Sequence, residues 1–312
     1  MSDLLAEPLV RLFLGLFAFL AVATLTGRVL ARRGGDTATL ANLTSRIDSW
    51  WAMIAILAVT FLAGKIATIV LFALVSFWCL REFISLTPTR ASDHYTLAAA
   101  FYLFLPAQYV LLWDGWLSVF TIAIPVYAYL LLPVISVLRG ETEDFLLRIS
   151  KIQWALMLAV YCLSHAPALL MLRIEDYPVG PFGLLAFLLL IVQASDVLQY
   201  VFGKLFGKRR LAPLVSPNKT WEGLILGAGA ATLLGGALHG LTPFGPAGGL
   251  AMAATITLAG ALGGLVLSAV KRSLGAKDWG TMIEGHGGML DRMDSIVFAA
   301  PLFFHLTNYF FA

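Results

Sequence analysis

Charged residues are scarce in this chain of 312 residues. Asp, Glu, Lys and Arg make up 12% of it, where a soluble globular domain carries about 25%. Hydrophobic residues make up 60%, and the mean hydropathy is +0.86. Repeated apolar runs are long enough to cross a bilayer. The composition excludes a soluble globular protein and predicts an all-α polytopic integral membrane protein with about ten transmembrane helices.

Cysteine is almost absent as well. Cys79 and Cys162 both lie in apolar runs, so we expect small packing residues and no disulfide framework. The first apolar run lacks a basic leading region and a small-residue cleavage site, and we therefore expect no cleavable signal. A net charge of +3 is small, and we expect no nucleic-acid partner.

Ten apolar segments can be marked along the chain. They cover residues 9–27, 49–63, 66–84, 97–113, 117–138, 152–172, 182–201, 221–241, 247–269 and 295–311. The second is short, and with the third it could form one helix broken around Gly64-Lys65, which would give nine spans.

The basic residues favour ten spans. If the polar segment after Ser268 is cytoplasmic and the spans alternate, every Lys and Arg of the 21 except Arg11, Lys65 and Arg173 lies on the cytoplasmic side. Both termini would then lie outside the cytoplasm. Nine spans would place the basic residues near the end of the first segment on the wrong side.

The most polar part of the chain runs from Ser268 to Asp294. Its cations suit phosphate oxygens, and its aspartates suit Mg²⁺, which binds a few carboxylates together with water and substrate phosphate. Asp291 and Asp294 are three residues apart, so on a helix both carboxylates face one way. Gly287 and Gly288 would let the backbone approach a ligand closely. These parts suit metal-assisted chemistry on a nucleotide phosphate.

A second polar segment begins at Asp196, an acid near the end of an apolar run and therefore a functional candidate. It leads through a basic stretch to Ser216-Pro217-Asn218-Lys219-Thr220-Trp221-Glu222-Gly223. Lys219 and the two hydroxyls would offer donors to phosphate near a helix N-terminus, which favours anions. Trp221 is expected to be an interfacial anchor, with base stacking as the alternative. For Glu222, helix capping and a part in metal binding stay open.

Both segments resemble the phosphatidate cytidylyltransferase (CDP-diacylglycerol synthase) family. The resemblance rests on the eight residues from Ser216 and on the order Ser268, Lys271-Arg272, Lys277-Asp278, Gly280, His286-Gly287-Gly288, Asp291-Arg292-Met293-Asp294. Two places depart from the family pattern. Glu284 stands where Pro, Gly or Ser is usual, and Val197-Leu198-Gln199 replaces the small residues after the aspartate, so we expect a different shape of space near Asp196.

The resemblance is strong over residues 196–295 and weak before them. We therefore divide the chain into an N-terminal transmembrane region, residues 1–180, and a C-terminal catalytic region, residues 181–312. The chain is interpreted as a divergent member of the family. We expect a multi-pass protein of a bacterial-type inner or cell membrane, with a polar active site on the cytoplasmic face.

The resemblance implies cytidylyl transfer from CTP to phosphatidic acid, giving CDP-diacylglycerol and pyrophosphate, with Mg²⁺ as cofactor. It implies catalytic roles for Lys277, His286 and Arg292. It implies substrate binding by Ser216, Lys219, Thr220, Lys271, Arg272, Gly287 and Gly288. It implies metal binding by Asp196, Asp278, Asp291 and Asp294. The partners are the two substrates and the bilayer, with a homodimer as a possible assembly.

Two other functions compete with this one. A CTP-dependent lipid kinase, transferring the γ-phosphate to a polyprenol-type alcohol, needs the same clamps and differs only in its products. An ion-coupled transporter predicts charges at mid-membrane and related halves, whereas the charges here cluster at one face.

Three further expectations concern structure. Arg81-Glu82 is interpreted as an interfacial pair with snorkelling side chains. Prolines inside or near the spans should kink them. The eighth and ninth segments are rich in small residues, which let membrane helices approach closely, so we expect a tight hairpin that holds the two polar segments side by side.

Overall fold

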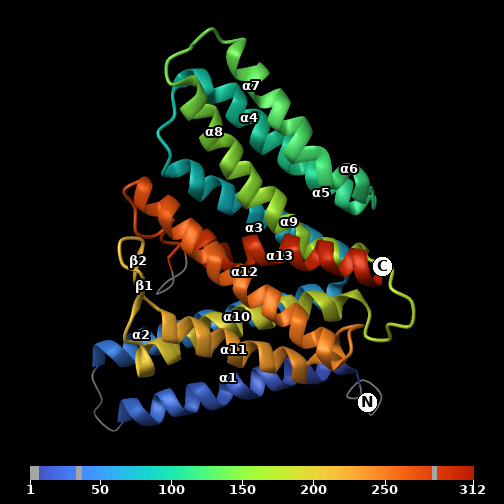
Figure 1. Ribbon diagram of the computed structural model, residues 1–312, viewed down its shortest axis with the longest axis vertical. Coiled ribbons are helices and arrows are strands. Elements are labelled where there is room, and N and C mark those ends of the chain that lie inside the picture. The colour runs from blue at the N-terminus through green and yellow to red at the C-terminus, as the bar shows by residue number, and fades with distance from the viewer. Residues whose placement is uncertain (1–6, 33–36, 283–286) are drawn as a thin grey trace.

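The computed structural model describes residues 7–32, 37–282 and 287–312, and it is almost entirely helical (Figure 1). The N-terminal part holds α1 (Pro8–Arg32), α2 (Thr37–Ala63), α3 (Lys65–Ser85), α4 (His94–Ala99), α5 (Leu105–Trp113), α6 (Leu117–Ile122), α7 (Tyr129–Val137), α8 (Phe145–Leu156) and α9 (Leu163–Ala168). The C-terminal part holds α10 (Pro181–Phe206), β1 (Arg210–Ala212), β2 (Ser216–Thr220), α11 (Trp221–Ala237), α12 (Pro246–Ser273) and α13 (Met289–Phe311).

Short π and 3-10 segments join several of these helices into longer rods. The π segments are η3 (Ala100–Phe104), η4 (Ala123–Ala128) and η5 (Met157–Cys162), and the 3-10 segments are η2 (Ala91–Asp93), η6 (Leu169–Met171) and η7 (His239–Leu241). Pro125 lies inside η4, and Pro106 and Pro167 follow η3 and η5 closely. Proline lacks the N–H that an α-helix needs there, which accounts for the π segments near these residues, and the expected kinks stay predictions.

Each of the ten apolar segments lies on helical structure. Within the described part of the chain, seven helical stretches are long and apolar enough to cross a membrane: Pro8–Val29, Lys65–Ser85, Ala91–Trp113, Leu117–Val137, Phe145–Met171, Pro181–Phe206 and Pro246–Ser273. The multi-pass helical membrane protein is therefore confirmed. Spans at α2, α11 and α13, and with them the count of ten, stay predictions.

α2 and α3 are separate helices. Gly64 between them has φ +92, a conformation that favours glycine. In Figure 1 the end of α10, the start of α11, the end of α12 and the start of α13 lie on the left. α1 begins and α13 ends on the right. The segments expected to share one side of the membrane thus gather on one side of the molecule, and its assignment to the cytoplasm stays a prediction.

An ionic clasp joins the connection between α3 and α4 to the connection between α7 and α8. Arg148 Nε lies 3.0 Å from Asp93 Oδ1, and both side chains are buried. Arg90 lies 2.8 Å from Glu141 and from Glu143. The hydrogen bond from the Arg90 guanidinium lowers the pKa of Glu143. The clasp fixes the connection between α3 and α4 against that between α7 and α8.

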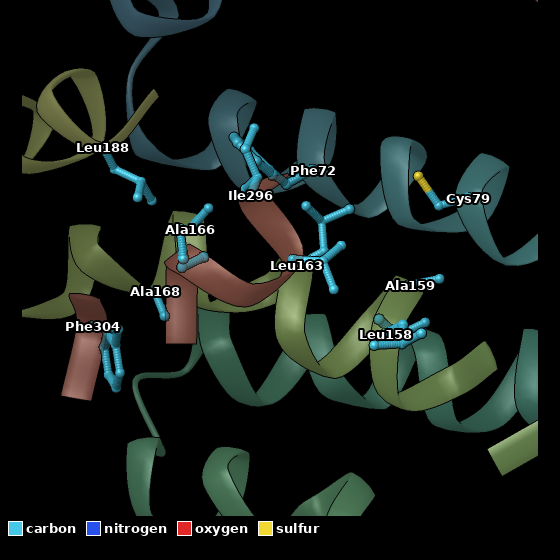
Figure 2. Close-up of a cluster of buried hydrophobic side chains, with 14 of the residues drawn as sticks. Phe72, Cys79, Leu158, Ala159, Leu163, Ala166, Ala168, Leu188, Ile296 and Phe304 are labelled. Atoms are coloured by element: carbon cyan, nitrogen blue, oxygen red, sulfur yellow. The ribbon is translucent and has the colours of Figure 1, made fainter. Parts of the chain in front are cut away.

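The core runs through both regions into which we divided the sequence. Figure 2 shows side chains from α3, η5, α9, α10 and α13 in one cluster, with Phe72, Leu163, Leu188 and Ile296 among them. α13 packs in this cluster against α3, α9, α10 and α12, so the helix that carries the last aspartates of the motif is held by helices from both regions. The division at residues 180–181 stays a prediction.

Glycines bring α10, α11 and α12 close together. A Cβ at Gly227 would lie 2.5 Å from Gln199 Cα on α10, and one at Gly236 would lie 2.6 Å from Leu250 Cδ2 on α12. The tight hairpin expected for the eighth and ninth segments is present, with η7 between α11 and α12. α11 also packs on the backbone of Gln199, one of the residues that departs from the family pattern.

One feature was not expected from an all-α prediction. β1 and β2 pair antiparallel in a two-stranded hairpin, with Arg210 opposite Thr220 and Ala212 opposite Ser216. Arg272 Nε donates to Val215 O at 3.4 Å, which ties the hairpin to the end of α12. The two polar segments therefore do lie side by side, as the hairpin of α11 and α12 requires.

Candidate active site

The first turn of α13 is organised around Asp291. Its Oδ2 accepts hydrogen bonds from Gly288 N at 2.9 Å and from Trp279 N at 2.8 Å. Its Oδ1 accepts one from Lys271 Nζ at 2.5 Å. Asp291 and Lys271 are 9% and 8% exposed. Asp291 thus caps its own helix and pairs with a buried ammonium, so both of its oxygens are occupied in the structure.

One turn further along, Asp294 faces Asp196 of α10. Ser295 lies between them, because its Oγ donates to Asp196 Oδ1 at 3.1 Å while Asp294 Oδ1 accepts from Ser295 N at 2.7 Å. The two carboxylates are close enough to repel each other. Among residues 7–32, 37–282 and 287–312, no hydrogen bond reaches Oδ2 of either aspartate, so this pair keeps oxygens free for a ligand.

Lys219 reaches this pair from β2, across Gly264 of α12. A Cβ at Gly264 would lie 2.9 Å from Lys219 Nζ, 3.6 Å from Ser295 Oγ and 3.8 Å from Asp294 Oδ2. The ammonium, the hydroxyl and the carboxylate therefore meet over a residue without a side chain. The positive charges of Lys219 and Arg292 act on both Asp196 and Asp294.

Arg292 brings an unused donor to this position. Its Nε is buried and has no hydrogen-bond partner in the described structure. A buried donor without an acceptor is costly, and beside the Lys219 ammonium and the two carboxylates the Arg292 donor suits an anionic ligand. The site can therefore bind a phosphate group next to the carboxylate pair.

The other predicted site residues lie outside the carboxylate pair, and several of them are exposed. Thr220 caps α11, with its Oγ1 accepting from Gly223 N at 3.1 Å. Ser216 begins β2, and Arg272 and Lys277 are exposed. Asp278 is exposed too, and its Cβ would lie 3.5 Å from a Cβ at Gly287, whose φ of +79 favours glycine.

Three further predictions concern Glu222, Gly288 and His286. Glu222 Oε2 accepts from Lys208 N at 3.0 Å and Arg209 N at 3.1 Å, so it holds the start of the hairpin. Gly288 N is engaged by Asp291, so the structure offers no free amide there for the expected approach to phosphate. The predicted catalytic His286 and the departure at Glu284 lie outside the described residues.

The four predicted metal ligands do not form one compact group. In the part of the chain that the structure describes, no set of three or more His, Cys, Asp or Glu side chains is placed to hold a metal. Asp196 and Asp294 form a pair, Asp291 is paired with Lys271, and Asp278 is exposed. A two-carboxylate pair fits Mg²⁺, because this ion is bound in proteins by one or two carboxylates and completes its shell with water and substrate phosphates.

Glu82 is the residue that sequence reasoning missed. The expectation of an interfacial snorkelling pair is wrong for it: Glu82 is 8% exposed, and its carboxylate accepts from Met289 N and Leu290 N at 2.8 Å each. Arg81 alone is exposed, with its guanidinium 4.8 Å from the Trp78 ring centre. The signal was present in the sequence, since an acid within an apolar run is costly, as at Asp196.

Comparison with known proteins identifies the chain's relatives. The model of the cytidylyltransferase family matches residues 44–310. An uncharacterized protein, YnbB, of Escherichia coli (strain K12) is 37% identical over 302 residues, which cover 94% of this chain and 96% of that one.

Two phosphatidate cytidylyltransferases match a shorter part. That of Mycobacterium leprae (strain TN) is 43% identical over 39% of this chain and 39% of its own length. That of Brucella abortus biovar 1 (strain 9-941) is 43% identical over 41% of this chain and 48% of its own length. The chain thus spans less than half of these two relatives. With the family model matched over most of its length, the chain belongs to the cytidylyltransferase family and is a nucleotidyltransferase enzyme of the membrane.

Proposed function

We propose that the protein transfers the cytidylyl group of CTP to phosphatidic acid, giving CDP-diacylglycerol and pyrophosphate, on the cytoplasmic side of the membrane. The observation that carries the proposal is the carboxylate pair Asp196–Asp294 with Lys219 and Arg292 beside it. The names of the partial relatives support the lipid acceptor. CTP is a cytosolic nucleotide, so the face that carries Lys219 and Arg292 would face the cytoplasm.

The residues divide the work of this reaction between them. A phosphate oxygen of phosphatidic acid attacks the α-phosphorus of CTP. The bond from the α-phosphorus to the oxygen that joins it to the β-phosphorus breaks, and pyrophosphate leaves. Such a transfer needs positioning and charge neutralisation more than covalent help. Lys219 and the buried Nε of Arg292 would bind the phosphates at the pair, while the exposed Arg272 and Lys277 would attract the triphosphate.

Asp196 and Asp294 would hold Mg²⁺ through their free oxygens. Bound there, the ion would neutralise charge on the phosphates and on the leaving group. It would also relieve the repulsion between two neighbouring carboxylates. Asp291 and Asp278 remain candidate ligands from the sequence, and the contacts of Asp291 favour a supporting role for it. A catalytic role for Lys277 and His286 and substrate binding by Ser216, Thr220 and Lys271 also stay predictions.

The test uses CTP labelled in two positions. The purified protein in detergent with Mg²⁺ and phosphatidic acid should move label from the α-phosphate of CTP into lipid and release pyrophosphate. Label from the γ-phosphate entering a polyprenol-type alcohol would instead identify the lipid kinase. Asp294→Asn should lower the rate of transfer roughly 100- to 1,000-fold, whereas Asp114→Asn, which changes an exposed aspartate directly after α5, should leave it unchanged. Absence of transfer from either label would contradict the proposal.

A further inference from the structure

The N-terminus of α13 is bound by a carboxylate from the other half of the chain. Glu82 lies in the last turn of α3, and its Oε1 and Oε2 accept from Met289 N and Leu290 N. Asp291 takes the amide just before them, Gly288 N. Three successive amides at the start of the helix are therefore paired with carboxylates. A bound phosphate would have to displace one of these carboxylates to use them.

The glycines of the motif are shaped to this contact. A Cβ at Gly288 would lie 2.5 Å from Glu82 Oε2, and one at Gly280 would lie 2.9 Å from Glu82 Oε1. Both positions must stay bare for the carboxylate to reach the helix. The sequence suggested that Gly288 is glycine so that phosphate can approach the backbone. The contact with Glu82 accounts for the absence of a side chain at this position instead.

The next residue of α3 holds the other end of the same segment. The ring of Phe83 stacks on that of Trp279, with centres 4.9 Å apart. Trp279 is 1% exposed, and its backbone N donates to Asp291 Oδ2. Glu82 and Phe83 therefore hold Trp279 and the start of α13, and the ionic clasp beyond α3 fixes the connection that follows α3.

We propose that Glu82 is a positioning residue of the reaction, holding the start of α13 so that Arg292 and Asp294 face Asp196 and Lys219. The proposal rests on the proposed function. Arg292 and Asp294 lie within two turns of the amides that Glu82 binds, so a shift or rotation of the helix start moves both. A displacement of about 1 Å at reacting groups can cost about 100-fold in rate.

The test compares Glu82→Gln and Glu82→Ala with Arg81→Gln. Gln has the same shape but offers one acceptor and sets an NH₂ group against the second amide, whereas Ala removes both acceptors. We expect kcat to fall roughly 10-fold for Gln and roughly 100-fold for Ala, with KM for CTP within about threefold of wild type, because the phosphate-binding side chains remain. Arg81→Gln changes the charge of the neighbouring exposed residue and should keep wild-type kcat.

Hydrogen–deuterium exchange of the peptide covering residues 287–293 supplies a readout that does not depend on activity. Exchange at Met289 and Leu290 should become faster in both Glu82 variants and stay unchanged in Arg81→Gln. Unchanged exchange in Glu82→Gln would overturn the proposal, as would a loss of activity that only follows the fraction of folded protein in a thermal melt. Wild-type kcat in Glu82→Gln despite faster exchange would overturn it too. A wild-type protein that transfers no cytidylyl group would instead refute the proposed function, whatever the exchange shows.

Discussion

Two pairs of carboxylates lie at the first two turns of α13, and each pair joins one aspartate of α13 to an acid of another helix. The surroundings of the two pairs differ sharply. Glu82 and Asp291 together accept from the amides of Trp279, Gly288, Met289 and Leu290, and Asp291 also pairs with Lys271. Asp196 and Asp294 share Ser295 as their hydrogen-bond donor within the described chain. Every carboxylate oxygen of Glu82 and Asp291 accepts a hydrogen bond from the protein. In the described chain, the Oδ2 atoms of Asp196 and Asp294 accept none.

The difference teaches that residue type does not decide the role of these acids. A carboxylate with several backbone donors is stable as an ion where it lies and stabilises the fold. Two carboxylates with few donors repel each other and gain from a cation. The first pair therefore suits a structural role in the site, and the second pair suits a role in binding and catalysis. Neutralising one member of each pair tests this difference.

Asp294→Asn should have the largest effect on activity. It removes one of the two free carboxylates, and we expect kcat to fall roughly 100- to 1,000-fold, the range found when one electrostatic group of a transition-state clamp is lost. The thermal midpoint should stay the same or rise, because repulsion with Asp196 disappears. The measurements are initial rates at several Mg²⁺ concentrations and a thermal melt in detergent.

Asp196→Asn serves as the matched variant on the facing helix and should behave in the same way. If Asp294→Asn lowered the thermal midpoint strongly and kept the wild-type response to Mg²⁺, the proposed division between the two pairs would be wrong.

Asp291→Asn should show the opposite balance. It leaves the buried Lys271 ammonium without its counter-ion, and breaking a buried ion pair from one side costs about 3 kcal/mol of stability. The thermal midpoint should fall clearly, and kcat per folded molecule should fall less than in Asp294→Asn.

Lys271→Met and the double variant complete a cycle for this pair. The double variant should lose less stability than the two single losses added together, because neither charge is then left alone. Additive losses would show that the Lys271–Asp291 contact does not stabilise the protein.

The sequence was sufficient for the helices and for part of the site. Apolar runs of span length fold as helices because the bilayer leaves backbone groups no other partner, and the cost of an acid in such a run was enough to find Asp196. The β1–β2 hairpin was missed because its strands are short and polar and show no alternation. The apolar pattern began the last helix at residue 295, whereas α13 begins at Met289 and includes Asp291 and Asp294.

What the spacing of Asp291 and Asp294 could not show is that Asp291 turns back to cap the helix start. Glu82 was missed for a related reason. Its partners Met289 and Leu290 are 207 and 208 residues away, and periodicity relates only residues a few positions apart. Which donors satisfy a buried carboxylate is decided by packing between distant helices, and therefore only the structure separates the two pairs.

Gly264→Ala should have the smallest effect and tests how the second pair is completed. A Cβ there would lie 2.9 Å from Lys219 Nζ, and the flexible end of the lysine can move aside, so we expect the fold and thermal midpoint to be kept. Moving the ammonium away from Asp294 should lower kcat/KM for CTP about 10-fold, as the loss of about 1.4 kcal/mol of charge stabilisation would. The measurement is kcat/KM at saturating Mg²⁺.

Gly229→Ala is the control for this change, since a Cβ at Gly229 has nothing within 4 Å, and it should leave kcat/KM unaltered. In a Lys219→Met background, Gly264→Ala should cause no further loss, because the group that it displaces is already gone. An equal loss of kcat/KM in both backgrounds would mean that Gly264 acts through helix packing. It would also mean that the Lys219 ammonium does not bind ligand together with Asp196 and Asp294.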